Sequence, residues 1–227
     1  MIDLEEILLK GCTISSSGTT GTPKKIFRTP SNLKSCIEVA LKGQNITSTS
    51  SILTVTRMTH AGGLLLQTLP AYTIGCDISI EKFSAFTFLQ RFKRHTHTFL
   101  PPAMCEAVIK TKGFKTADLS GKHIAMGSDP IPASHIQAFI DKGAIVYANW
   151  GMSEIGPWTI NKKYTPGDKA DEKVLGDTFW CDYKIIDDQL YVKGPLCIYD
   201  DWFATGDLVE YKNDQLYFIS RKVEYIL

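Results

Sequence analysis

The sequence has no apolar run long enough to cross a membrane and no excess of charge of either sign. Its 227 residues carry 25 Lys and Arg against 24 Asp and Glu, a formal net charge of +1. A near-neutral chain has no broad electrostatic attraction for nucleic acid or for a membrane surface. The one basic cluster, at 91–94, is better explained as the solvated face of a helix. We therefore expect no membrane span and no nucleic-acid partner.

Cysteine pairs at metal-binding or redox spacing are also missing. The six cysteines lie far apart and form no CxxC motif, so neither a zinc ribbon nor a thioredoxin-type site is expected. Scattered cysteines in a chain of this size are typical of a reducing compartment. The acidic start, MIDLEE, differs from the basic start of a secretory signal. We expect a cytoplasmic protein.

What the sequence does contain, over its first three-fifths, is an alternation of strand-like and helix-like segments. Predicted helices lie at 83–94 and 131–142, and a further helix is expected to begin at Ser31 and to end at Gly43. Predicted strands are short apolar runs at 51–55, 78–80, 98–100, 124–126 and 144–148. Such alternation predicts an α/β fold with a mostly parallel sheet and flanking helices.

After about residue 165 the pattern changes to short strands separated by turns. Residues 183–186 and 189–192 predict one hairpin, and residues 208–211 and 215–219 predict another. The expected organisation is an α/β subdomain at 1–165, followed by a small antiparallel β subdomain at 166–227. Ligands of such folds favour the carboxyl ends of the sheet strands and the crevice between parts.

The segment SSSGTTGTPKK, at 15–25, consists almost entirely of hydroxylated residues, glycine and lysine. Glycine permits backbone conformations that are closed to other residues, so that backbone N–H groups can converge on an anion. Hydroxyl groups and a lysine would add donors and positive charge. The segment suits a polyphosphate, although the Walker A spacing is missing. From composition alone, a surface loop without a ligand is the alternative.

The order SSGTTGTPKK resembles the phosphate-binding loop of the adenylate-forming superfamily, which includes acyl-CoA synthetases, luciferases and the adenylation domains of peptide synthetases. In that family a glycine follows the loop lysine, whereas Lys25 stands there in this chain. The resemblance implies that the loop binds the phosphates of ATP and that Thr20 takes part in catalysis and in Mg²⁺ binding. The loop residues implied are Ser16, Ser17, Gly18, Thr19, Thr20, Gly21 and Lys24.

The segment NWGMSE, at 149–154, resembles the family's aromatic-Gly-x-Thr-Glu motif. Taken alone, it also fits a tight turn after a strand. The resemblance implies that Trp150 stacks on adenine, that Ser153 offers a hydroxyl to phosphate and that Glu154 is a catalytic carboxylate and Mg²⁺ ligand. The nucleotide pocket would also include Asn149, Gly151 and Met152.

Thr205-Gly206-Asp207 resembles the family's Thr-Gly-Asp motif, in which the aspartate, here Asp207, accepts hydrogen bonds from both ribose hydroxyls. An aspartate in a β-turn without a ligand is the alternative. Ser220-Arg221 resembles a Gly-Arg motif, which implies that Arg221 reaches the ribose or the α-phosphate and assists catalysis.

The remaining candidates concern the acyl pocket. His60 stands where the family often places a residue that guards this pocket, although a packed or surface histidine is the alternative. Gly127 and Ser128 match loosely the loop that lines the adenine and acyl sites. His95 and His97 could suggest a metal site, but no third ligand is evident, and a strand edge is the preferred interpretation. The acyl-pocket candidates are His60, Gly62, Gly127, Asn149, Trp150, Gly151, Met152, Gly156 and Trp158.

The resemblance spans 15–221 and implies activation of a small carboxylic acid by ATP and Mg²⁺, with coenzyme A as a further acceptor. An aromatic or modest aliphatic acid is expected, and a succinylbenzoate is one candidate. Family members also carry a subdomain before the loop and a mobile C-terminal domain with a catalytic lysine, which this sequence does not match. The alternatives are a core completed by a domain in trans, a non-catalytic ATP, AMP or acyl-adenylate binder, and a piece of a longer protein. We expect an apolar flank covered by a second copy or by a partner chain.

Overall fold

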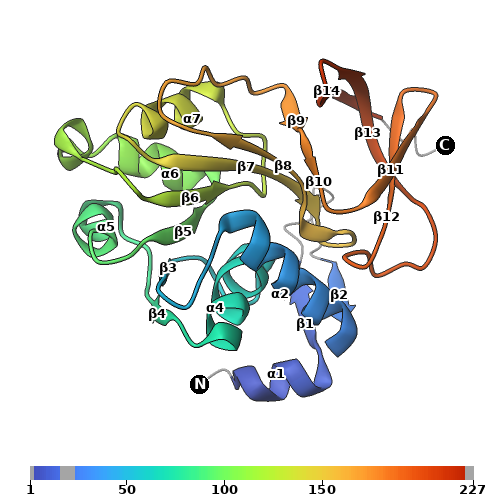
Figure 1. The fold of residues 1–227 in the computed structure, drawn as a ribbon, viewed down its shortest axis with the longest axis horizontal. Coiled ribbons are helices and arrows are strands. Elements are labelled where there is room, and N and C mark those ends of the chain that lie inside the picture. The colour runs from blue at the N-terminus through green and yellow to red at the C-terminus, as the bar shows by residue number, and fades with distance from the viewer. Residues whose placement is uncertain (1–2, 16–23, 223–227) are drawn as a thin grey trace.

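The computed structural model describes residues 3–15 and 24–222, and these residues form three sheets with helices around the largest of them (Figure 1). The α/β architecture and the mostly parallel large sheet confirm the predicted fold class. In the described part of the chain, no helix combines the length and the apolar character that a membrane crossing requires.

The large sheet has seven strands in the order β10-β8-β7-β6-β5-β3-β4. Within this sheet, β3 to β7 are parallel to one another, and β8 and β10 run antiparallel to their neighbours. All four positions of the interior strand β5 are buried, as expected for a strand covered on both faces. The strands are β3 (Ser51–Thr54), β4 (Asp77–Ile80), β5 (His97–Leu100), β6 (His123–Met126), β7 (Ile145–Met152), β8 (Gly156–Tyr164) and β10 (Thr178–Phe179).

Helices cover both faces of this sheet, because alternate residues of each strand point to opposite sides. Leu100, Met126 and Val146 share one core with residues of α5, α6 and α7. Phe99 and Ala125 share another with α2 and a π-helical turn. The helical segments are α1 (Leu4–Lys10), α2 (Pro30–Gln44), α3 (Ala61–Gly63), the π-helical turn (Leu64–Thr68), α4 (Leu69–Ile74), α5 (Ala85–Phe92), α6 (Pro102–Ile109), a 3₁₀ helix (Lys112–Thr116) and α7 (Ala133–Ile140).

The predicted limits of helix α2 are wrong at both ends. The helix is capped by Thr29, whose side chain accepts a hydrogen bond from the Asn32 backbone N–H at 3.2 Å. It passes through Gly43 and ends before Asn45, which has a left-handed φ of 56°. Gly43 does not terminate the helix, because its role is steric: a Cβ at this position would overlap the indole of Trp158.

The small sheet has five antiparallel strands in the order β11-β12-β13-β14-β9. Both predicted hairpins are present. Their turn residues, Asp187-Asp188 and Asn213-Asp214, all have φ between 49° and 61°, as two-residue hairpin turns of type I′ require. The strands are β9 (Val174–Gly176), β11 (Asp182–Ile186), β12 (Gln189–Lys193), β13 (Phe203–Lys212) and β14 (Gln215–Arg221).

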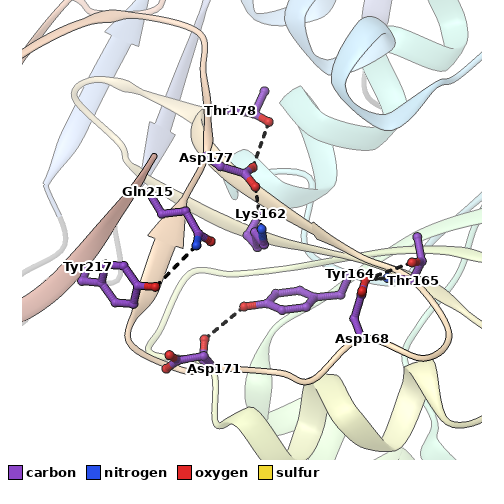
Figure 2. Close-up of polar contacts among 9 residues, drawn as sticks. All are labelled: Lys162, Tyr164, Thr165, Asp168, Asp171, Asp177, Thr178, Gln215 and Tyr217. Carbon is purple, nitrogen blue, oxygen red and sulfur yellow. Dashed lines mark hydrogen bonds and ion pairs between the residues drawn. The ribbon is translucent and has the colours of Figure 1, made fainter. Parts of the chain in front are cut away.

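The chain crosses between the two sheets in the region shown in Figure 2. Strand β9 joins the small sheet, and β10 then returns to pair with β8 of the large sheet. At this crossing Lys162 Nζ lies 2.5 Å from Asp177 Oδ2, and the Tyr164 hydroxyl donates to the Asp171 carbonyl at 3.1 Å (Figure 2). The subdomain division at residue 165 stays a prediction.

The third sheet is a two-stranded hairpin that the sequence did not predict. Strand β1 (Cys12–Ser15) pairs antiparallel with β2 (Lys25–Arg28), and Ser15 lies opposite Lys25. The pairing brings together the two ends of the segment that resembles a phosphate-binding loop.

Candidate functional site

The candidate site lies where strand β7 ends, next to strands β13 and β14. A tight turn at 153–155 connects β7 to β8, and Met152 pairs with Gly156 across it. Gly151 permits this close approach, because a Cβ there would overlap the Gly156 carbonyl oxygen. The segment predicted as a motif is therefore also a tight turn after a strand, and the two interpretations coincide.

Asp207 is the centre of the arrangement. Its side chain is only 5% exposed, and its Oδ2 accepts a hydrogen bond from the Trp150 indole N–H at 3.0 Å. Arg221 Nε lies 3.3 Å from Asp207 Oδ1, and the two residues pair across β13 and β14. Residues from three separate motif-like segments are thus in direct contact.

The environment of Asp207 acts on its charge in two directions. Burial raises the pKa of this carboxyl group, while Arg221 and the Trp150 hydrogen bond lower it. Thr205 braces the same turn, since its hydroxyl donates to the Leu190 carbonyl at 2.8 Å and accepts from the Asp207 backbone N–H at 3.1 Å. The site therefore holds a buried acid against two fixed donors.

Glu154 lies in the turn after β7 and faces the end of the predicted phosphate-binding segment. Its side chain is 16% exposed, and its Oε1 lies 3.6 Å from Nζ of Lys24, whose side chain is 67% exposed. An ion pair of this exposure is weak, worth up to about 1 kcal/mol. The Glu154 side chain is thus mostly enclosed by protein, and Lys24 is a weakly held ionic partner.

Arg28 was not among the predicted site residues, yet it joins three parts of the site. It is fully buried, and its guanidinium donates to the Ser153 carbonyl at 2.6 Å and to the Leu196 carbonyl at 2.9 Å. It also contacts the side-chain oxygen of Asn32, whose amide donates to the Pro195 carbonyl at 2.8 Å. The signal was present in the sequence, because Arg28 occupies the same inward register of β2 as Ile26.

His60 caps the short helix α3 next to the loop after β6. Its Nδ1 accepts from the Gly62 backbone N–H at 3.1 Å, so Nε2 carries the proton and faces the Ser128 hydroxyl at 3.4 Å. The ring stacks on Phe99 with centroids 6.4 Å apart. Burial lowers the pKa of His60, and Asp129 partly opposes this effect. The arrangement favours a neutral imidazole.

Gly127 and Asn149 connect the His60 region to the Asp207 region. A Cβ on Gly127 would lie 2.7 Å from the Asn149 carbonyl oxygen, so only glycine fits without a shift. Asn149 is fixed by Asn161, whose amide donates to its Oδ1 at 3.0 Å. Trp158, a candidate for the acyl pocket, is 1% exposed and packs in the core beside Tyr147.

The described residues also bear on the predicted metal contacts. They include no group of three or more His, Cys, Asp or Glu side chains placed to hold a metal ion. His97 instead stacks on His123 with centroids 4.4 Å apart, and its Nε2 lies 3.0 Å from the Gln44 carbonyl. The predicted loop residues Ser16, Ser17, Gly18, Thr19, Thr20 and Gly21 lie outside the described residues.

Comparison with known proteins gives a family match and several relatives. A family model described as "AMP-binding enzyme" matches residues 12–206. Indoleacetate–CoA ligase from Aromatoleum aromaticum is 26% identical over 93% of this chain and 48% of its own length. Feruloyl-CoA synthase from Amycolatopsis is 28% identical over 64% of this chain and 30% of its own length. A 4-coumarate–CoA ligase from Solanum tuberosum is 30% identical over 63% of this chain and 28% of its own length.

Solved structures share the fold at lower identity. O-succinylbenzoate coenzyme A synthetase from Bacillus subtilis, in complex with AMP, is 22% identical with a TM-score of 0.76, over 92% of this chain and 49% of that one. An amide bond synthetase from Marinactinospora thermotolerans is 23% identical with a TM-score of 0.76, over 92% of this chain and 48% of that one. The chain thus spans about half the length of these proteins, or less.

Proposed function

Because this chain belongs to the AMP-binding enzyme family, we propose that it binds ATP and activates a small carboxylic acid as its acyl-adenylate. One observation carries the proposal, the buried Asp207 carboxylate held by Trp150 and Arg221. A carboxylate offers about four lone-pair sites. Each Asp207 oxygen therefore keeps capacity for one ribose hydroxyl, and the pair of oxygens suits a vicinal diol.

Trp150 and Arg221 would bind the rest of the nucleotide. The indole N–H of Trp150 is committed to Asp207, which fixes the ring and allows its face to stack on adenine. The Arg221 side chain is more than half exposed, so its guanidinium could reach the ribose or the α-phosphate. Fixed donors of this kind would stabilise charge that develops on phosphate oxygens.

Glu154 fits the role of a Mg²⁺ ligand. Proteins usually hold Mg²⁺ through one or two carboxylates together with substrate phosphates, and Glu154 offers a partly exposed carboxylate with a weak partner. When bound, Mg²⁺ would neutralise phosphate charge. Thr20 as a second contact remains a prediction. In the proposed reaction a carboxylate oxygen of the acid bonds to the α-phosphorus of ATP, and the bond from that phosphorus to pyrophosphate breaks.

An aromatic acid is the proposed substrate, with coenzyme A as the proposed acceptor. The relatives reported above are named for indoleacetate, feruloyl and 4-coumarate substrates, all of them aromatic. The His60 ring, held by its stacking on the buried Phe99, would offer an aromatic contact to a flat ring. A His60 with Nε2 protonated would donate to a polar substituent of the acid.

A second copy or partner chain and a cytoplasmic location complete the proposal. Several large apolar side chains are exposed on the N-terminal half, and a partner would cover them: Leu9, Phe27, Tyr72 and Ile80. Six free cysteines fit a reducing compartment.

The test is calorimetric titration of Mg·ATP and of AMP into the chain and its Asp207→Ala variant. We expect saturable binding that Asp207→Ala weakens by at least about tenfold, since charged hydrogen bonds are worth roughly 1.5–3 kcal/mol. Asp200→Ala, at an exposed aspartate of the neighbouring loop, is the matched control and should bind normally. Lack of nucleotide binding by the parent chain would refute the proposal.

Turnover is measured next, as pyrophosphate release with indoleacetate, ferulate, 4-coumarate and O-succinylbenzoate, each compared with octanoate. Release with an aromatic acid supports adenylation. Nucleotide binding without release for any acid would favour the alternative, a non-catalytic nucleotide binder or a core that needs a second domain.

A further inference from the structure

A groove of about 810 Å³ lies between α5, the C-terminal end of α6 and the 3₁₀ helix, away from the candidate site. In Figure 1 these helices lie on the left of the molecule, whereas β13 lies on the right. The groove's volume is within the range of specific binding sites, about 300–1,000 Å³. Its lining includes Phe86, Leu89, Lys93, Lys110, Lys112 and Lys122.

Positive charge dominates this lining. Four lysines face one carboxylate, Asp118, which already accepts hydrogen bonds from the Ser120 backbone N–H at 2.9 Å and hydroxyl at 2.6 Å. Lys110 also pairs with Glu106, but both side chains are more than half exposed, so the pair is weak. Since the whole chain carries a net charge of only +1, the groove is a local concentration of positive charge.

The lysines come from separate elements and serve two purposes. Lys122 is half-buried and donates to the carbonyls of Lys93 and His95 at 3.0 and 2.7 Å, so it holds the backbone after α5 in place. Lys93, Lys110 and Lys112 are exposed and surround the opening from α5, α6 and the 3₁₀ helix. Their long stems spread the charge over the rim.

Apolar residues form the remaining wall. Phe86 is 92% exposed at the start of α5, and Leu89 lies one turn further along the same helix. Aromatic residues are enriched in protein interfaces, and complementary charges around an interface steer the partner. Phe86 is therefore placed to contact an apolar side chain that enters the groove.

We propose that this groove docks an acidic, amphipathic peptide segment of a partner protein. Carboxylates of the segment pair with Lys93, Lys110 and Lys112, and an apolar residue packs against Phe86 and Leu89. A single phosphate fits less well, because phosphate sites gather their donors around one point, whereas these lysines are spread over a rim. The location leaves the Asp207 region open while the partner is bound.

The test uses fluorescence anisotropy with a labelled helical peptide of about 15 residues, long enough to form a helix, with Glu and Leu on opposite faces. The groove variant is Lys93→Glu/Lys110→Glu/Lys112→Glu. The matched control reverses three exposed lysines elsewhere, Lys34→Glu/Lys169→Glu/Lys173→Glu. A Gln-for-Glu peptide and tripolyphosphate are the comparison ligands.

We expect the acidic peptide to bind the parent chain and the control variant equally, within about twofold, and to bind the groove variant at least about tenfold more weakly. Phe86→Ser should lower the affinity for the acidic peptide, and added salt should lower that affinity further. Equal losses in the two triple variants would mean bulk charge attraction and would overturn the proposal. Failure of the acidic peptide to bind the parent chain would also overturn the proposal. So would a groove that binds tripolyphosphate but not the peptide, with a tripolyphosphate affinity that Phe86→Ser leaves unchanged.

Discussion

The two main sheets differ in how deeply their strands are buried. Every residue of β5 in the seven-stranded sheet is buried, whereas β11 of the five-stranded sheet has no buried residue and β14 has only one. Yet the small sheet carries Asp207 and Arg221, the charged pair of the candidate site. The less buried, five-stranded sheet therefore supplies the charged groups. Contacts from the large sheet, such as the one from Trp150, help to hold them in place.

The largest effect of this difference in burial is expected in the core that packs against the large sheet. Phe139 is fully buried and meets Phe114 edge-on with centroids 5.0 Å apart. Phe139→Ala should lower the free energy of unfolding by about 3–5 kcal/mol, because it opens a cavity that close-packed neighbours cannot fill. Urea denaturation measures the loss, and Phe86→Ala, at an exposed phenylalanine, should change little. Equal losses at both sites would contradict the burial difference.

Arg28 tests the connection between the sheets. Its guanidinium binds Ser153, in the turn after β7, and Leu196, between β12 and β13. Arg28→Met should destabilise the fold by roughly 3 kcal/mol, since it leaves several buried acceptors unsatisfied. The same variant should weaken Mg·ATP binding in the folded fraction, because the Ser153 carbonyl, next to Glu154 in the turn, loses its hydrogen-bond donor.

Arg28→Lys is the matched control, since it keeps the charge without the two-sided fork, and its loss should be smaller. If both variants bind nucleotide like the parent chain, Arg28 has only a stabilising role.

A pH titration tests a buried histidine of the large sheet. Burial and the neighbouring His123 lower the pKa of His97 to about 4 from its ordinary value of 6.5. The folded state thus favours the neutral imidazole. The stabilisation is complete above pH 6.5 and is lost as the pH falls through about 4, by up to about 3 kcal/mol.

Urea midpoints between pH 7 and 4 would show this dependence. His97→Gln should flatten it, although carboxyl groups elsewhere add their own slopes. An unchanged pH profile in that variant would show that other groups dominate.

The smallest expected effect is at the contact between the sheets. Trp150→Phe keeps an aromatic ring but removes the indole N–H that binds Asp207. Nucleotide affinity should fall about fivefold, the loss of about 1 kcal/mol expected for one hydrogen bond. The pKa of Asp207, followed by NMR, should rise at the same time, because one of the two groups that lower it is gone. Tyr191→Phe, within the small sheet, is the comparison variant.

The parts of the fold that were predicted correctly are those set by local chemistry. Asp187-Asp188 and Asn213-Asp214 tolerate positive φ, so the two hairpins could be located from sequence. The limits of α2 were missed because Thr29 and Asn45 compete with Ser31 and Gly43 for the same roles. The β1–β2 pairing was missed because its partners lie on either side of a polar segment.

The candidate site shows the same division. Trp150, Asp207 and Arg221 were predicted from motifs, and the structure brings them together, although their roles toward a nucleotide stay predictions. Arg28 was overlooked because its acceptors, the carbonyls of Ser153 and Leu196, belong to segments more than 100 residues away along the chain. No local pattern carries such a contact, and only the inward register of β2 hinted at it.

The two-residue strand β10 has a consequence for how the chain can be divided. Along the chain, β9 of the small sheet lies between β8 and β10 of the large sheet, and β10 lies between β9 and β11 of the small sheet. The strands of the two sheets therefore alternate along this part of the sequence. A cut at 165 would leave β8 without the neighbour that covers its outer edge. Complementation from two fragments should therefore work better with a break beyond β10, which keeps β10 in the same fragment as β8, than with one at 165.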